Sequence, residues 1–345
     1  MKPQLMAIAA NQRGLVTRAQ ARDAGCRGPE LRGLTAVGGS WIVVRRGVYV
    51  ERDTWTALTE LDRWKLRDRA ALLTGRRRVE LSHDSAARLH ALPLVRLRSE
   101  LTHVTRADVQ GCRTEHGIKH HRGALPTSGR VTLEGLPATG LARTALDVAR
   151  EHGLATGLVA CDAALRLGLR PAHLTHELGA MAHWPGTVAA REAALLADPR
   201  AENAAESLAR LLVLELGIGQ PEPQFALLLH DRIVWCDLRV GNHVFEFDGR
   251  IKYVGRADGG VAVRPPEEVV WAEKDRERLI CAEGLGMSRI IWSDFFGSAR
   301  DRAVRRLRAE YAATAARFGD RRPAHLAEFS ARHTFDRVPG ATRAP

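Results

Sequence analysis

The chain has 345 residues, of which 45% are hydrophobic, and it carries a formal net charge of +12. This length favours two or three domains, and the composition excludes a disordered or fibrous protein. The amino terminus offers only one short apolar run, Leu5 to Ala10, which excludes a signal-peptide core or a membrane span there. Five cysteines are scattered singly without a CxxC pair, as in a reducing compartment, so we expect a cytoplasmic protein.

The positive charge is concentrated at the start of the chain. Residues 1–80 hold 16 Lys and Arg against 8 Asp and Glu, so this segment contributes +8 of the total. A basic amino-terminal domain indicates an anionic polymer as its partner, most simply double-stranded DNA.

Residues 1–80 show the element order of a winged-helix domain. Thr17 can cap a helix over 18–24, Pro29 suits the first turn of a second helix to about Val37, and "SWIVVRRGVYV" predicts strand, turn and strand. The second helix would enter the major groove, and the hairpin would lie along the DNA backbone. The candidate DNA contacts are Arg27 and Arg32 on the second helix and Arg45 and Arg46 on the hairpin. A small helical domain with solvated arginines is the alternative.

Residues 81–197 are expected to form a middle α+β domain. A long amphipathic helix, from about Trp55 to Leu73, leads into it. A strand and a short helix in "RRVELSHDSAARLHALPL" follow, then strands around "LTHVTR" and "GIKHHR", and then a strand, a turn and a helix in "GRVTLEGLPATGLARTALDVAR". Arg143 and Asp147 are spaced to pair on one face of that helix, and helices dominate to about Ala197.

Three histidines of this domain, His116, His120 and His121, lie close together in the sequence like the ligands of a metal site. A strand would direct His120 and His121 to opposite faces, and no carboxylate is spaced to complete a ligand set. A polar strand edge is therefore the favoured interpretation.

Residues 198–317 predict an α/β module with the order helix, strands, helix, strand. Asp198 and Pro199 start the first helix, and Gly217 ends it. Strands are expected at 227–229, 233–240 and 243–248, a helix in "PPEEVVWAEKDRERLICAEGLG" and a last strand in "MSRIIWSDF". Residues 318–345 have no clear period, which predicts a tail that is at best partly ordered.

The strands of this module carry a group of acids. Alternation through "HVFEFDG" places Glu246 and Asp248 on one face about 7 Å apart, where two carboxylates repel unless a cation or a proton intervenes. Asp237 on the preceding strand can come alongside Glu246, and Glu206 on the opening helix could reach the same end of the sheet.

Together these four acids form a plausible oxygen-ligand set for Mg²⁺ or Mn²⁺. Lys252, just beyond the strand, could orient an attacking water or stabilise the charge of a phosphorane. The alternative is an ordinary hairpin with acids at its strand ends and an exposed lysine.

The first half of the chain resembles a known family. "LVTRAQARDAG", "SWIVVRRGVYV", "LSHDSAARLHALP" and "GLPATGLARTALDVAR" together resemble the AbiEi-family antitoxins of bacterial type IV toxin–antitoxin systems, over roughly residues 5–170. The resemblance implies a winged helix that binds the promoter of its own operon and a following antitoxin domain. It also implies a nucleotidyltransferase-like toxin as a possible partner.

The last module resembles the restriction-endonuclease-like PD-(D/E)xK superfamily, near the very-short-patch-repair (Vsr) endonucleases. The stretches that carry the resemblance are "ESLAR", "DLRVGNHVFEFDGRIKY" and "KDRERLICAEGLGMSRIIW". It implies a catalytic set of Glu206, Asp237, Glu246, Asp248 and Lys252, with Glu206, Asp237 and Glu246 as metal ligands. It also implies that Arg276, on the helix behind the site, faces phosphate. The nominal motif has Glu-x-Lys, whereas this chain has Glu246-Phe247-Asp248 with a lysine four residues later.

These observations support three hypotheses of function. The first is a DNA-binding regulator or antitoxin that carries a nuclease-fold domain, and the second is an active Mg²⁺-dependent DNA endonuclease in defence or repair. The third is a nuclease-fold domain that binds a partner and whose acids are relics.

Overall fold

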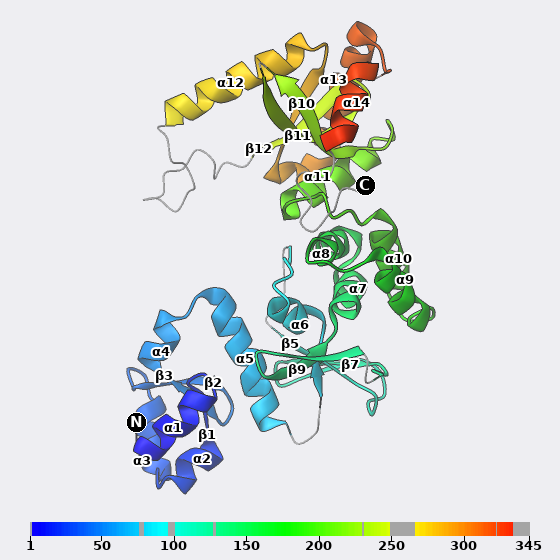
Figure 1. The fold of residues 1–345 in the computed structure, drawn as a ribbon. Coiled ribbons are helices and arrows are strands. Elements are labelled where there is room, and N and C mark those ends of the chain that lie inside the picture. The colour runs from blue at the N-terminus through cyan, green and yellow to red at the C-terminus, as the bar shows by residue number, and fades with distance from the viewer. Residues whose placement is uncertain are drawn as a thin grey trace. The chain divides into compact units, whose positions relative to one another are not determined.

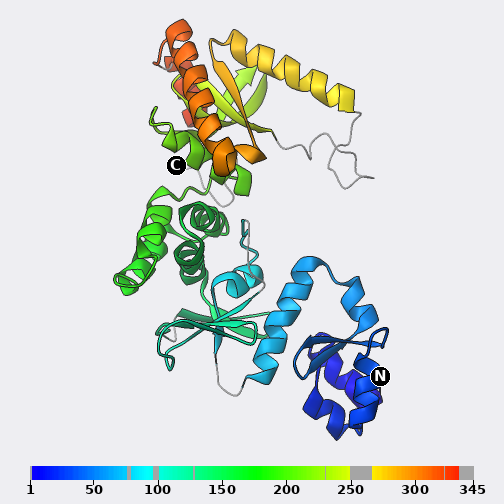
Figure 2. The same ribbon diagram turned by 180° about the vertical axis from the view of Figure 1, so that it is seen from behind.

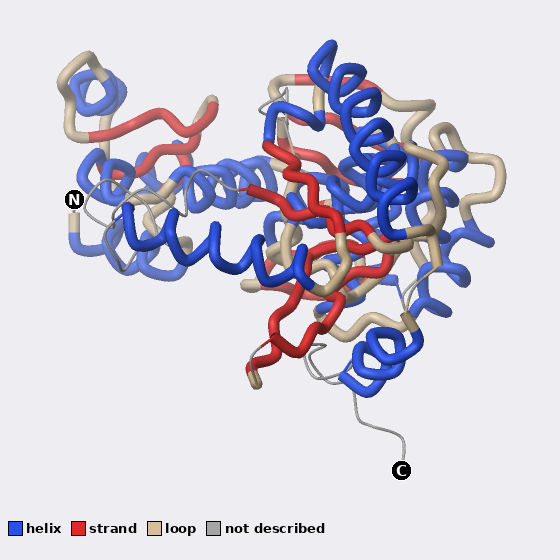
Figure 3. Tube along the Cα trace, turned by 90° about the horizontal axis from the view of Figure 1, so that it is seen from above, coloured by secondary structure: helices blue, strands red, loops and turns tan. Residues whose placement is uncertain are grey.

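The computed structural model describes residues 2–75, 79–95, 101–126, 129–229, 231–248, 266–321 and 323–333, and for 266–273 the backbone alone. Within these ranges the chain is a mixed α+β protein with sheets of three, six and four strands (Figures 1 and 3). Two compact units are formed by Met1–Ala160 with Ala172–Ala194 and by Cys161–Pro171 with Leu195–Pro345. None of the helices in the described ranges is both long enough and apolar enough to cross a membrane.

The first part of the chain folds as short helices with an antiparallel sheet of order β1-β3-β2. Its elements are α1 (Pro3–Asn11), β1 (Val16–Thr17), α2 (Arg18–Asp23), α3 (Gly28–Thr35), β2 (Trp41–Arg45) and β3 (Val48–Glu51). The two helices and the hairpin predicted here are confirmed, with small shifts at their ends. Thr17 accepts a hydrogen bond from the Gln20 backbone N–H in a capping box, and Leu31 and Trp41 join the core that holds α3 on the sheet.

The long helix predicted from about Trp55 to Leu73 is in fact two helices, α4 (Arg52–Ala57) and α5 (Glu60–Thr74). Leu58 has an extended backbone, and Thr59 caps α5 by accepting a hydrogen bond of 3.2 Å from the Asp62 N–H. A threonine cap followed by acids in the first turn strongly favours a new helix start. The apolar pattern that predicted one helix is therefore divided between α4 and α5.

The middle of the chain forms a six-stranded sheet of order β6-β7-β5-β4-β9-β8. Its strands are β4 (Glu80–Leu81), β5 (Thr102–Arg106), β6 (Arg113–Glu115), β7 (Ile118–Arg122), β8 (Arg130–Leu133) and β9 (Leu136–Thr139). The helices of this region are α6 (His83–Leu89), α7 (Leu141–His152), α8 (Leu154–Arg166), α9 (Pro171–Ala180) and α10 (Thr187–Leu196). The short strands β6 and β9 were not predicted, because "RTE" has no buried face and "LPAT" contains a proline, which is unusual inside a strand.

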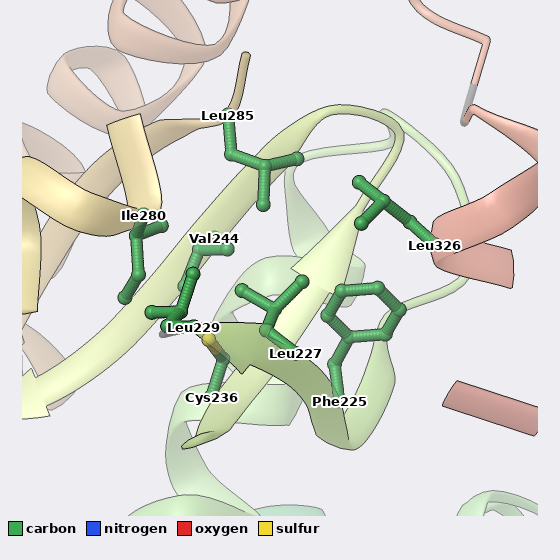
Figure 4. Packing of buried hydrophobic residues seen from close by; sticks show 8 residues of the cluster. All are labelled: Phe225, Leu227, Leu229, Cys236, Val244, Ile280, Leu285 and Leu326. Carbon is green, nitrogen blue, oxygen red and sulfur yellow. The ribbon is translucent and has the colours of Figure 1, made fainter. Parts of the chain in front are cut away.

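The last part of the chain has the predicted order of helix, three strands, helix and strand, in a sheet of order β10-β11-β12-β13. Its elements are α11 (Ala204–Glu215), β10 (Glu222–Leu229), β11 (Arg232–Val240), β12 (His243–Asp248), α12 (Pro266–Ala282), β13 (Gly286–Ile291), the 3₁₀ helix η4 (Trp292–Phe295), α13 (Gly297–Phe318) and α14 (Ala324–His333). The strands β10 to β12 are antiparallel, and β12 pairs with β13 in parallel. The core contains Ile280 of α12 and Leu326 of α14, which pack with Phe225 and Leu227 of β10 (Figure 4), and α13 crosses the sheet in the view from behind (Figure 2).

Three predictions for this part need correction. The module was expected to close with the strand in "MSRIIWSDF", whereas the long helix α13 follows it. The first helix begins at Ala204, not at Asp198, because the Asn203 side chain caps it by accepting from the N–H groups of Ala205 and Glu206. The predicted tail also contains α14, in which Leu326 is buried and Ser330 accepts a hydrogen bond from the Ala226 N–H of β10. This ten-residue helix is stabilised by its contacts with β10, so it forms without a clear helical period of apolar residues in its own sequence.

Candidate functional site

The arginines predicted to contact DNA lie on α3 and on the β2–β3 hairpin. Arg27 is the residue before α3, Arg32 lies in its last turn, and both are exposed. Arg46 is exposed in the hairpin turn, and Arg45 is half-buried at the end of β2. The Arg18 N–H donates to the Gly47 carbonyl over 2.8 Å, which fixes the hairpin turn beside the start of α2.

The outer surface of α3 combines positive charge with little bulk. A Cβ added to Gly33 would meet nothing within 4 Å, and one added to Gly28 would meet only the Arg32 guanidinium at 3.7 Å. The acid of this helix, Glu30, is already engaged, because its carboxylate accepts from the Arg27 N–H and lies 3.8 Å from Lys2 Nζ. The surface of α3 can therefore approach an anionic polymer closely.

Two of the predicted acids, Glu206 on α11 and Asp237 on β11, interact electrostatically. Glu206, in the first turn of α11, is buried, and its Oε2 accepts from the Glu202 N–H at 2.8 Å and from Gln224 Nε2 at 3.0 Å. Burial raises the pKa of Glu206 to about 7, and the charge of Asp237 acts in the same direction. This carboxyl group therefore titrates near neutral pH.

Asp237 also joins two strands. The regular pairing of β11 with β12 runs from Val240 to Leu238 and stops there. Beyond that point the Phe247 N–H donates to Asp237 Oδ2 over 2.8 Å. The carboxylate thus takes the place of a backbone acceptor, which is a structural reason for an acid at this position.

Glu246 is buried against α12, where it is bound by an arginine. Arg276 Nη1 and Nη2 donate to the two carboxylate oxygens over 3.1 and 2.9 Å, and Nη2 also donates to the Trp235 carbonyl over 2.6 Å. Arg276, which the resemblance implies to face phosphate, here binds Glu246 and the Trp235 carbonyl, and a contact with phosphate stays a prediction. Asp248 Oδ2 lies 3.7 Å from Arg289 Nη1, and Lys252 lies outside the described residues.

The acids do not form a ready metal site as they stand. Among the described residues, three possible ligand atoms lie within 4.8 Å of one another only in the group of His83, His103 and His121. The predicted acids do not form such a group. Both oxygens of Glu246 are occupied by Arg276. The predicted set of Glu206, Asp237 and Glu246 therefore does not fit Mg²⁺ or Mn²⁺ in this arrangement.

The histidine positions correct the prediction of a polar strand edge. His121 is only 5% exposed and meets His83 and His103 from other elements, whereas His116 is exposed in the turn between β6 and β7. Sequence spacing missed this group because its members are far apart in the chain. The available signal was a histidine in each of "LSHDS", "LTHVTR" and "GIKHHR", but the pairing of β5 with β7 was needed to bring them together.

Comparisons with known proteins give limited information. No family model matches the chain. It is similar to the Uncharacterized protein MT2308 of Mycobacterium tuberculosis strain CDC 1551 and to the Uncharacterized protein Rv2248 of strain H37Rv. Each match is 36% identical over 104 residues, which are 30% of this chain and 38% of the relative. The matched part thus spans well under half the length of these curated relatives.

Proposed function

We propose that the protein is a DNA-binding regulator of the AbiEi-like antitoxin class, in which residues 1–80 act as a winged helix on double-stranded DNA. The observation that carries this proposal is the exposed arginine surface of α3, flanked by Gly28 and Gly33, together with the basic turn of the hairpin. A helix with no Cβ at two outer positions can lie deep in a groove, and guanidinium groups pair well with guanine edges and phosphates.

In this proposal the two arginine pairs have different roles. Arg27 and Arg32 reach base edges in the major groove, whereas Arg45 and Arg46 neutralise phosphates. A base contact by an arginine contributes about 1–3 kcal/mol of discrimination against the wrong base. Loss of a phosphate contact weakens binding to all sequences alike.

Fluorescence anisotropy with the DNA upstream of the protein's own gene, and with a scrambled duplex, tests this assignment. Arg32→Ala should lower the affinity for the upstream DNA by about 5- to 100-fold, as the loss of a base contact predicts, and should reduce the preference over the scrambled duplex. Arg302→Ala, which removes an exposed arginine of α13, is the control and should bind as the wild type does. If Arg27→Ala and Arg32→Ala bind the upstream DNA as tightly as the wild type does, α3 is not the recognition helix.

A second candidate function, a Mg²⁺-dependent endonuclease, requires Glu246 to release Arg276 and bind a metal ion together with Glu206 and Asp237. The observation that favours it is the electrostatic interaction between Glu206 and Asp237. Supercoiled, linear and mismatched DNA incubated with the protein and Mg²⁺ or Mn²⁺ provide the test. Cleavage by the wild type that is lost in Glu246→Ala, with DNA binding retained, would support this function. If none of these DNA substrates is cleaved, the endonuclease function is excluded and the regulator remains as the proposed function.

A further inference from the structure

Three buried histidines meet on one face of the six-stranded sheet. His83 begins α6, His103 lies in β5, His121 lies in β7, and one ring nitrogen from each lies within 4.8 Å of the other two. In the parallel register Thr105 is opposite His121, so His103, two residues earlier, lies on the same face of the sheet. The helix α6 lies over this part of the sheet (Figure 1).

The geometry of the rings is close to that of a ligand set. His103 Nδ1 and His121 Nε2 are 3.1 Å apart, and two nitrogens on one tetrahedral ion with bonds of about 2.0–2.1 Å lie roughly 3.3 Å apart. The His83 ring stacks on the His121 ring, with 3.5 Å between centroids and 14° between planes, so His83 must turn before its in-plane lone pair meets the same ion as that of His121. His83 also has a left-handed φ of +48°, a strained conformation that clusters at functional sites in proteins.

Polar groups behind the rings can orient them toward an ion. His103 Nε2 has no hydrogen-bond partner among the described residues, yet it faces Asp84 Oδ2 at 3.7 Å. His83 Nδ1 lies 2.9 Å from Ser82 Oγ. In metal sites a ligating histidine directs its second ring nitrogen to a carboxylate or another acceptor, which fixes the tautomer and the ring.

An imidazole binds a metal ion through a ring nitrogen that carries no proton. His121 Nε2 and His103 Nδ1 are hydrogen-bonded to each other, so one of them carries a proton, and metal binding requires the other tautomer of that ring.

A cavity of about 820 Å³ reaches this group, with His83 and His121 in its wall. Lys119, Arg122 and Arg150 line the same cavity, where Lys119 pairs with Glu151 and Arg150 pairs with Asp147. An ion held by three imidazoles would be accessible from the cavity side.

We propose that His83, His103 and His121 bind one divalent transition-metal ion, with Zn²⁺ as the best match, and leave one coordination position open to a small anion in the cavity. Imidazole ligands suit Zn²⁺, and three protein ligands with an open fourth position are typical of accessible zinc sites. This site lies in a different part of the chain from the DNA-binding arginines, so the two proposals stand or fall separately.

Metal titration of the full chain tests the site. After removal of metals with a chelator, the wild type should bind one equivalent of Zn²⁺, and Co²⁺ should give the visible absorption of a tetrahedral site. Loss of an outer partner typically weakens a metal site 10- to 100-fold, so His121→Ala, which loses a ligand, should weaken it by more than about 100-fold. The matched control is His120→Ala, the next residue on β7, whose side chain points to the opposite face, and it should bind as the wild type does.

The open position has its own readout. Addition of azide should shift the Co²⁺ absorption of the wild type, and an unchanged spectrum would overturn the claim of an open position. A wild type that binds no stoichiometric metal would overturn the site itself, whether or not the variants fold. Equal loss of binding in His120→Ala and His121→Ala would also overturn it, because a general loss of structure would then explain the effect.

Discussion

Glu206 is the residue at which pH should act on stability. Its pKa is raised from 4.5 to about 7, chiefly by burial, so the folded state favours the protonated form. The stability that this group contributes is therefore fully present below pH 4.5 and is lost as the pH rises through about 7.

Replacement of Glu206 by Gln should remove this pH dependence. Between pH 4.5 and pH 8 the free energy of unfolding of Glu206→Gln should rise relative to the wild type by about 3 kcal/mol, the value of a shift of this size. Denaturant unfolding at several pH values measures the difference, with Asp301→Asn, a change at an exposed acid of α13, as the control. Parallel pH profiles for wild type and Glu206→Gln would contradict this account of the carboxyl group.

The pair of Glu246 and Arg276 should matter for stability. Arg276→Ala leaves a buried carboxylate without its bidentate partner, and breaking a buried pair costs about 3–5 kcal/mol. Because the Arg276 side chain is 24% exposed, we expect a smaller loss, of about 2 kcal/mol, in denaturant unfolding. Arg278→Ala, an exposed position on the same helix, should have little effect, and equal effects of the two changes would argue against the pair.

Side-chain partners could be predicted from the sequence where one helix fixes both of them. Arg143 and Asp147 are four residues apart on α7, and their ion pair is confirmed at 2.8 Å. The partners of Glu246 and of His121 come from other elements, so their identity depends on packing that a local pattern does not contain.

At the scale of elements, caps and turns gave the best predictions, whereas short edge elements escaped. The start of α2 at Thr17 and the order of α11, β10 to β12, α12 and β13 follow from local residues, whereas α1, β1, β6 and β9 were not predicted. The helix α14 could not be recognised in this way, because its position depends on contacts with β10.

Truncation of Leu326 measures what α14 contributes. Leu326→Ala leaves a cavity between α14 and the core around Phe225, and large-to-small changes of this kind cost about 2–5 kcal/mol. The loss should appear in denaturant unfolding of the full chain, with His325→Ala, its exposed neighbour, as the control. A Leu326→Ala chain as stable as the wild type would mean that α14 is not part of the core.

At the scale of the whole molecule, the proposed DNA binding would draw on the net charge of +12 for long-range attraction, with contacts at α3 and the hairpin. The composition indicates DNA as the partner class, and this stays a prediction. Composition did not reveal which arginines are exposed and which, like Arg276, are used inside the protein.

The salt dependence of DNA binding tests the central claim most directly. Each neutralised phosphate contributes about −0.9 to the slope of log K against log salt concentration, so the two phosphate contacts of Arg45 and Arg46 contribute about −2 to the slope of the wild type. In a titration of wild type and the double variant Arg45→Ala/Arg46→Ala, the variant should bind less tightly and its slope should be smaller in magnitude by about 2. A wild-type slope near zero, or identical slopes for the two proteins, would contradict the account.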